Sequence, residues 1–181
     1  MLIRKSTIND LPSILKLIQD GRQKMISEGN TTQWTNGHPS EQQIISDIQQ
    51  GVSHVIVDEQ AHQPIATFAL IEGPDPTYAH IYDGQWLDSL PYYVIHRVAS
   101  APGVHGIMRM VLEYAFSFTD TIRIDTHEDN RTMRALLLKY GFQHCGTILL
   151  ENGDPRLAYQ NGDSPSGPSP LPLPREGSRV N

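Results

Sequence analysis

The sequence predicts a mixed α/β sheet with helices on both of its faces. Short runs rich in β-branched and apolar residues alternate along the chain with longer amphipathic runs, and such alternation is typical of helices packed on a central sheet. Residues 125–142 show this unit most clearly, as a strand end, a turn capped by Asn130, a helix and an exit at Gly141. A glycine there favours a left-handed helix end. Four apolar residues of this segment recur at helical spacing: Met133, Leu136, Leu137 and Tyr140.

The first half of the chain is predicted to contain two helices between short strands. Pro12 is tolerated in the first turn of a helix that Asn9 or Asp10 can cap. Ser40 and Gln43 form a capping box, which opens the second helix. In order, the expected elements are a strand at 2–6, the first helix, a loop at 29–39, the second helix, and strands at 54–57 and 65–71.

The second half is predicted to add two helices and four strands after a loop-rich insert. Gly106 opens the first of these helices, after a tight loop at 101–105. The apolar face of that helix is expected to consist of Ile107, Met110, Val111, Tyr114 and Phe118. In order, the elements are the insert at 73–88, a strand at 92–100, this helix, a strand at 121–126, the helix after Asn130, and strands at 143–150 and 156–160.

Composition and charge narrow the class of protein. The 181 residues carry a formal net charge of −6, which argues against nucleic acid as a partner because phosphate binding needs clustered Lys and Arg. No apolar run approaches membrane-spanning length, and the N-terminus has neither an apolar signal core nor a small-residue cleavage site. The single cysteine, Cys145, excludes an intrachain disulfide. These features predict a cytoplasmic protein that binds neither nucleic acid nor a membrane.

The chain is predicted to consist of one domain and a tail. Residues 1–161 suffice for a domain with its own core. Residues 162–181 contain five of the thirteen prolines and have no periodicity, so we interpret them as a disordered tail rich in Pro, Ser and Gly. Two interpretations of this tail are open. It is either a polyproline stretch that binds an SH3-like partner or an extension without function.

A strand, a loop and a helix N-terminus follow one another between residues 92 and 107. Backbone N–H groups at a helix N-terminus bind phosphate, and an exposed strand edge can pair with an amide-bearing chain. This order of elements suits a cofactor that has both a phosphate group and an amide-bearing chain. An ordinary strand–helix unit shows the same order, however. No Gly-Lys-Ser/Thr follows the loop as in a Walker motif. No HExxH or paired-cysteine spacing predicts a metal site.

Two motifs resemble those of the GNAT superfamily of N-acetyltransferases. Asn130 is followed eleven residues later by Gly141-Phe142, as at the helix that contacts acyl-CoA in that family. Residues 106–109 and the apolar helix after them are similar to the later part of its phosphate-binding loop. The resemblance covers about residues 1–160.

The resemblance implies a GNAT-like fold, which is a mixed, mostly antiparallel sheet with a splayed central strand pair and helices on both faces. It also implies an acyl-CoA-dependent N-acyltransferase that moves acetyl from acetyl-CoA, as co-substrate, to a primary amine by direct attack, without a metal. Asn130 is expected to hydrogen-bond the pantetheine arm, and a backbone N–H near Val98 or Ala99 to meet the oxyanion. The residues expected to contact acetyl-CoA are Val98, Ala99, Ser100, Val104, His105, Gly106, Ile107, Met108, Arg109 and Asn130.

Three positions depart from the family pattern. Gly103 stands where Gln or Arg is usual, Met108 where Gly or Ala is usual, and Leu137 where a Tyr acts as general acid. The last departure concerns the protonation of the leaving thiolate. These departures support an alternative function, a non-catalytic acyl-CoA-binding sensor or regulatory module.

Two histidines and three aromatic residues are the candidates for catalysis and acceptor binding. Removing a proton from an amine needs a base, and histidine is a residue type that suits this task. His96 and His127 are the candidates, with hydrogen-bonded structural histidines as the alternative. Trp34, Tyr78 and Trp86 lie in predicted loops and are the acceptor candidates, with core packing as the alternative. The expected partner is a small-molecule or peptide amine: a simple amine, an amino-acid derivative and a protein N-terminus are all open, as is a homodimer.

Overall fold

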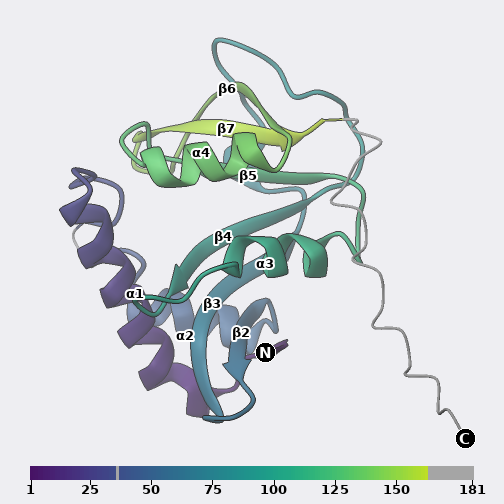
Figure 1. The fold of residues 1–181 in the computed structure, drawn as a ribbon. Coiled ribbons are helices and arrows are strands. Elements are labelled where there is room, and N and C mark those ends of the chain that lie inside the picture. Colours follow the sequence, from purple (N-terminus) through teal and green to yellow (C-terminus); the bar gives the residue numbers. More distant parts are fainter. Residues whose placement is uncertain (36, 163–181) are drawn as a thin grey trace, which may run out of the picture.

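The computed structural model describes residues 1–35 and 37–162, and Figure 1 shows a single sheet with helices packed on it. The predicted tail, from residue 163 onward, lies outside the described residues. In chain order the elements are β1 (Leu2–Lys5), the 3-10 turn η1 (Ile8–Asp10), α1 (Leu11–Ser27), α2 (Glu41–Gln49), β2 (Ser53–Asp58), β3 (Gln63–Glu72), the 3-10 turn η2 (Pro76–Tyr78), β4 (Tyr93–Ser100), α3 (Ile107–Ala115), β5 (Ile122–Thr126), α4 (Arg131–Lys139), β6 (Phe142–Leu149) and β7 (Pro155–Asn161).

The seven strands form one sheet in the order β1-β2-β3-β4-β5-β7-β6. Every neighbouring pair is antiparallel except β4 and β5, which are parallel and paired only through Tyr93–Ile122 and Val94–Arg123. Beyond these two pairs the strands diverge, as Figure 1 shows. The predicted fold class, with its splayed central strand pair, is therefore confirmed.

Alternating side chains of the strands divide the core between the two faces of the sheet. On one face, α1 and α2 pack through Ile14 and Ile44 against Val55 of β2. On the other face, α3 and α4 pack through residues such as Val111 and Leu137 against the central strands. Successive residues of a strand point to opposite faces, so the continuous apolar run of β2 serves both clusters.

The predicted helix caps are confirmed at two helices. Ser40 Oγ accepts a hydrogen bond from the backbone N–H of Gln43 at the start of α2. Asn130 Oδ1 accepts one from the backbone N–H of Met133 at the start of α4. In both cases the side chain satisfies a donor that has no partner within the helix.

The apolar face predicted for α3 is partly wrong. The buried residues are Ile107, Met108, Val111, Leu112 and Ala115, whereas Phe118 lies beyond the helix end and is 54% exposed. Residues 107–116 are apolar at most positions, so two neighbouring faces fit the helical period equally well. Packing against the sheet selects between them, and the chain leaves the helix at Ala115 to enter β5.

Asp10 does not cap α1 with its side chain, although the sequence predicts a cap at Asn9 or Asp10. Its carboxylate instead accepts two hydrogen bonds from the guanidinium of Arg4, each 2.8 Å long, and one from the backbone N–H of Thr7. The hydrogen bonds from Arg4, against the opposing effect of burial, lower the pKa of Asp10 to about 2. This carboxylate therefore ties β1 to the start of α1.

We expect Asp10→Asn to lower the free energy of unfolding at pH 7 by about 1–2 kcal/mol, because solvent screens a pair whose Arg4 side chain is 41% exposed. The pKa of Asp10 is lower in the folded than in the unfolded state, so the stabilisation is complete above about pH 4. It disappears as the pH falls through about 2. Urea unfolding between pH 7 and pH 3 measures this pH dependence of the free energy of unfolding. The control is Asp20→Asn, which breaks the ion pair with Lys16 within α1. It should change the free energy of unfolding by less than about 0.5 kcal/mol. A difference between Asp10→Asn and wild type that does not shrink with acid would contradict the assignment.

The insert between β3 and β4 is folded tightly against β6, the terminal strand of the sheet. Tyr82 pairs with Thr147 as an isolated bridge. At Gly84 a Cβ atom would lie 1.9 Å from the carbonyl oxygen of Cys145, so only glycine allows this approach. The insert thus covers part of a strand edge and fixes the position of Asp75, which begins η2.

Candidate active site

A cavity of about 600 Å³ lies where β4 and β5 diverge. His96 and Val98 of β4 and Asp125 of β5 line it. Residues of α2 and of the loop between α1 and α2 form one side, and the turn between β6 and β7 forms another. A gap between two strands leaves strand edges free, and an extended ligand can pair with such an edge.

Within this cavity, His96 lies between two carboxylates. Its Nε2 is 3.0 Å from Asp75 Oδ2, and its Nδ1 is 3.5 Å from Asp125 Oδ1. Burial would raise the pKa of Asp75, but hydrogen bonds from His96 and Thr77 outweigh it and lower that pKa to about 2. Asp75 is then an anion that can only accept, so Nε2 carries the donated hydrogen. Nδ1 is left as the ring nitrogen that can take up a proton.

Asp125 is itself held by Tyr78. The phenol O–H donates a hydrogen bond of 2.7 Å to Asp125 Oδ1. Burial, together with the negative charge of Asp125, raises the pKa of Tyr78 well above its ordinary value. Tyr78 therefore stays a neutral hydrogen-bond donor. It orients the Asp125 carboxylate and does not itself take up or release a proton.

A bulge interrupts β4 next to His96. Two residues of β4, Arg97 and Val98, share the position opposite Phe68 of β3. Arg97 adopts a left-handed backbone conformation with a φ of 56°, and its Nε lies 2.7 Å from Asp47 Oδ2 of α2. Bulges of this kind re-aim side chains and backbone donors at functional sites. Here Arg97 and Val98 both line the cavity.

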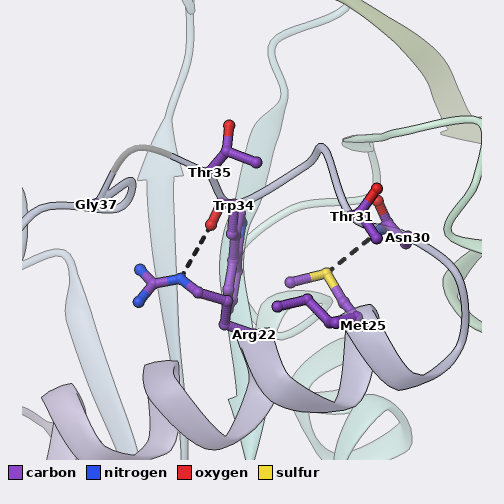
Figure 2. Close-up of a pocket in the computed structure, with 8 residues that line it drawn as sticks. Arg22, Met25, Asn30, Thr31, Trp34, Thr35 and Gly37 are labelled. Atoms are coloured by element: carbon purple, nitrogen blue, oxygen red, sulfur yellow. Dashed lines mark hydrogen bonds between the residues drawn. The ribbon is translucent and has the colours of Figure 1, made fainter.

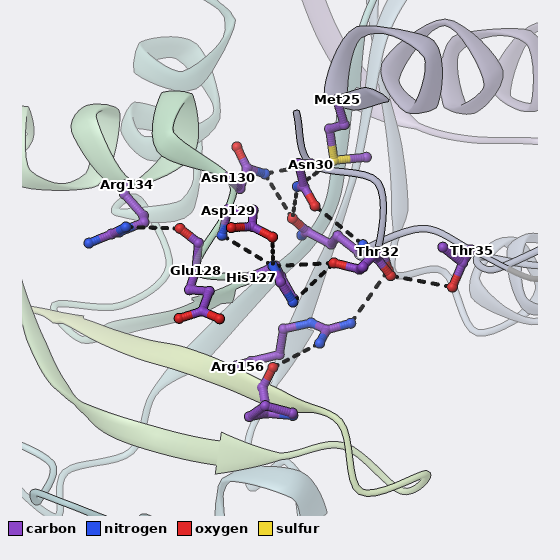
Figure 3. A network of polar contacts seen from close by, with 12 residues as sticks. Met25, Asn30, Thr32, Thr35, His127, Glu128, Asp129, Asn130, Arg134 and Arg156 are labelled. Carbon is purple, nitrogen blue, oxygen red and sulfur yellow. Dashed lines mark hydrogen bonds and ion pairs between the residues drawn. The ribbon is translucent and has the colours of Figure 1, made fainter. Parts of the chain in front are cut away.

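A polar network joins the loop between α1 and α2 to the start of α4 (Figure 3). Gln33 Oε1 accepts hydrogen bonds of 2.9 Å from Nδ2 of both Asn30 and Asn130. Since Asn130 Oδ1 caps α4, this one side chain uses both ends of its amide. Asn130 also lines the cavity, so the network fixes a predicted cofactor ligand at the cavity wall.

His127 belongs to this network and does not line the cavity. Its Nδ1 accepts a hydrogen bond of 3.1 Å from the backbone N–H of Asp129, and its Nε2 is 3.1 Å from Thr32 Oγ1. Figure 3 shows His127 between these two partners. Because both ring nitrogens of His127 contact protein groups, His127 suits a structural role. His96, which lines the cavity, is the better placed of the two to act as a base.

The loop before α3 presents backbone rather than side chains. Gly106 is the N-cap of α3, and both it and Gly103 have a φ near +80° (79° and 77°) with open space where a Cβ would lie. The first N–H groups of a helix have no partner within it, so they are free to bind phosphate. Met108, a departure from the family pattern, has its side chain in the main core and so leaves this loop open.

The other predicted cofactor residues lie around this loop. Ala99 is buried and faces α1, and Ser100 pairs with Ala66 of β3. The side chains of Val104 and Ile107 pack on the main core. His105 is exposed, and Arg109 Nε is 2.7 Å from Glu113 Oε1. Val98 and Asn130 are therefore the two members of the set that line the cavity.

Of the three aromatic candidates, Trp34 lines the cavity. It also lines a second cavity of about 240 Å³, which Figure 2 shows beside Arg22 and Met25 of α1. Tyr78 and Trp86 do not line the cavity. Trp86 donates from its indole N–H to the carbonyl oxygen of Tyr78 and stacks on the guanidinium of Arg123. Of the three, Trp34 is therefore the one that a molecule in the cavity can contact.

Comparison with solved structures finds this fold among acetyltransferases. A GNAT-family acetyltransferase from Streptococcus agalactiae is 32% identical to this chain, with a TM-score of 0.79 over 90% of this chain and 95% of its own. The chain belongs to the GNAT family of acetyltransferases. Membership of this family supports acyl transfer as its general activity.

Two more distant structures share the fold alone. An acetyltransferase of the GNAT family from Listeria monocytogenes is 22% identical, with a TM-score of 0.65 over 88% of this chain and 93% of its own. A chain of the NatC complex bound to Gag peptide and CoA is 16% identical, with a TM-score of 0.58 over 90% of this chain and 98% of its own. A scan against protein-family models and a search of curated proteins found no match.

In this GNAT protein, the position of the family's usual acid is part of the core. Leu137 is fully buried among the residues that pack between α4 and the sheet, and it does not line the cavity. Tyr140 also packs against that core, as its helical position predicts. From α4, the described residues that line the cavity are Met133 and the cap Asn130, so this helix offers no hydroxyl to a leaving thiolate.

Three site residues were missed by sequence reasoning. Asp75 is separated from His96 by 21 positions and lies in the insert, where its only local signal is an Asp-Pro-Thr pattern typical of a cap. Gln33 and Arg156 have no motif at all, and they enter the site because the sheet order brings their loop and strand together.

We expect Asn130→Ala to weaken acetyl-CoA binding by about 1–3 kcal/mol, because the variant leaves polar groups of the ligand unpaired. It should also lower stability by about 1 kcal/mol through loss of the α4 cap. Asn130→Asp is the matched variant, because it keeps an oxygen for the Met133 N–H but loses the amide donor. Calorimetry should therefore show weaker binding in both variants, whereas thermal unfolding should show a cap defect in the alanine variant alone. Unchanged affinity in two folded variants would remove Asn130 from the cofactor site.

Proposed function

We propose that this GNAT protein transfers the acetyl group of acetyl-CoA to a primary amine, with His96 as the general base. One observation carries the proposal: His96 lies between Asp75 and Asp125 on the wall of a cavity at the divergence of β4 and β5. An acetyl acceptor must lose a proton before it can attack, so an oriented base beside the cofactor gap suits this chemistry.

The reaction begins with an amine that arrives as a cation. Asp125 attracts the ammonium group, and His96 Nδ1 accepts one of its protons, directly or through a water molecule. The free amine nitrogen attacks the thioester carbonyl carbon, which forms the C–N bond and places a negative charge on the carbonyl oxygen. A backbone N–H at the bulge, near Val98, stabilises that charge. Collapse then breaks the C–S bond, the nitrogen gives its second proton to a water molecule, and CoA leaves as thiolate.

The leaving thiolate has no tyrosine acid from α4 in this proposal, because Leu137 occupies that position. A thiolate is a tolerable leaving group, so water or the protonated His96 can supply the proton after the C–S bond breaks. His96 then returns to the state in which Nδ1 is free.

The residues before α3 fit the phosphate end of acetyl-CoA. Two glycines with open space above them, Gly103 and Gly106, let a bulky anion approach the backbone. The helix dipole adds a favourable field for negative charge. The pantetheine arm would then lie along the free edge of β4, with Asn130 on its other side, and bring the thioester to the bulge.

The deciding experiment measures thiol release from acetyl-CoA across a panel of primary amines, together with acetyl-CoA binding by calorimetry. Turnover with at least one amine supports N-acetyl transfer. Tight binding without turnover on any amine would favour the alternative, an acyl-CoA-binding sensor. An absence of both would remove acetyl-CoA as the substrate of this protein.

A further inference from the structure

We propose that the acceptor is an amine that also carries a carboxylate, as an amino acid does, and that Arg156 binds this carboxylate. The inference rests on the proposed function, since it names the substrate class for the same cavity.

Most charged side chains of the cavity wall are paired. Arg97 is paired with Asp47 through its Nε, at 2.7 Å. Asp75 accepts a hydrogen bond from His96. Among the described residues, no carboxylate lies within ion-pair distance of Arg156, although only 5% of this residue is exposed. Asp125 and Asp154 act on this guanidinium through their charge, but neither contacts it. A buried guanidinium without a contacting anion is costly, which points to an anion supplied by a ligand.

Arg156 has hydrogen-bond donors left for such a ligand. Nη1 donates to the carbonyl oxygen of Pro155 at 2.8 Å, and Nη2 donates to that of Gln33 at 3.4 Å. Figure 3 shows the guanidinium reaching from β7 towards the loop that carries Thr32. A guanidinium has five N–H donors in a planar fork, so the remaining ones can hold a carboxylate at two points. Burial lowers the pKa of Arg156, yet an arginine stays charged in a protein.

The sheet register places Arg156 close to the amine end of the site. Asp125 of β5 pairs with Ala158 of β7, and Arg156 is two residues from Ala158 on the same strand. Asp125 and Arg156 are thus diagonal neighbours on one face of the sheet, about 7–8 Å apart, and both line the cavity. Tyr78 and His96 both contact Oδ1 of Asp125. Oδ2 of Asp125 can therefore attract an ammonium while Arg156 binds the carboxylate of the same molecule.

The other acids of the wall favour a carboxylate over a phosphate. Glu151 and Asp154, from the turn between β6 and β7, line the same cavity. Together with Asp125 they would repel a dianion more strongly than a monoanion. The site therefore suits a zwitterion with one negative charge, and Trp34 offers an apolar wall for its side chain.

The test compares matched acceptors: free amino acids, their amides, and the corresponding amines without the carboxylate. For wild type we expect kcat/KM to be about a hundredfold higher for the free acid. Arg156→Gln should remove this preference, mainly through a higher KM for the free acid, so that the free acid and the amine without a carboxylate have similar kcat/KM. Arg156→Lys should restore part of it, because a lysine keeps the charge but not the fork. Unchanged acetyl-CoA affinity and thermal unfolding establish that both variants fold.

Equal turnover of the three acceptor types, or a preference that survives in a folded Arg156→Gln, would overturn the inference. If no amine of any type turns over, the proposed function fails, and binding decides the inference alone. Calorimetry of the same acceptors with the CoA-bound protein then supports it if binding depends on the carboxylate and on Arg156. Binding that depends on neither, or no binding by any acceptor, overturns it.

Discussion

His96→Gln should lower kcat/KM for amine acetylation about a thousandfold, which corresponds to about 4 kcal/mol of transition-state stabilisation. Glutamine keeps a donor that can face Asp75 but has no nitrogen that accepts a proton near neutral pH. The affinity for acetyl-CoA should remain, because binding at the phosphate end does not involve this side chain. Steady-state kinetics from pH 6 to pH 10 measure the effect. Wild-type activity should rise with pH through one apparent pKa, whereas the variant should recover activity only where the amine deprotonates unaided.

The control for this variant is His127→Gln. His127 bonds the backbone N–H of Asp129 and the hydroxyl of Thr32, outside the cavity, so its replacement should change kcat/KM by less than about threefold. Asp75→Asn should have an intermediate effect because Asp75 only orients the ring. Since the pKa of Asp75 is about 2, this carboxyl stays ionised across the assay range and adds no step to the pH profile. If His127→Gln were the more damaging variant, the base would be misassigned.

Gly106→Val should abolish detectable acetyl-CoA binding, with an affinity loss of about a hundredfold or more. The side chain would project into the open space above the first turn of α3, where the phosphates must approach the backbone N–H groups. Because Gly106 has a φ of 79°, valine also strains the backbone by about 1–2 kcal/mol. Calorimetry gives the first effect, and thermal unfolding gives the second.

Gly51→Val separates these two effects. Gly51 has a φ of 70° at the end of α2, and the nearest atom to an added Cβ is the flexible end of Lys5 at 3.4 Å. This variant should lose a similar amount of stability but bind acetyl-CoA like wild type. If the two variants lost the same stability and had the same affinity for acetyl-CoA, Gly106 would be needed only for the left-handed backbone conformation. The phosphates would then bind elsewhere.

No helix in the described part of the chain combines the length and apolarity that a membrane crossing requires.

Local structure was largely determined by the sequence. The caps at Ser40 and Asn130, and the left-handed glycine at Gly141 with a φ of 82°, depend on neighbours within a few residues. Their chemistry is therefore readable without any tertiary contact. The motif from Asn130 to Gly141 also identified the family, because a family motif is a local pattern.

The tertiary structure decided which side chains form the site. The sheet order brings Asp75, His96 and Asp125 together from the insert, β4 and β5, and brings Arg156 to the same cavity from β7. It also selected the buried face of α3, because a helix that is apolar on several sides has no unique face by itself. Contacts between residues far apart in the chain depend on strand register and on the bulge at Arg97. No local propensity encodes these features, since both result from the packing of the whole sheet.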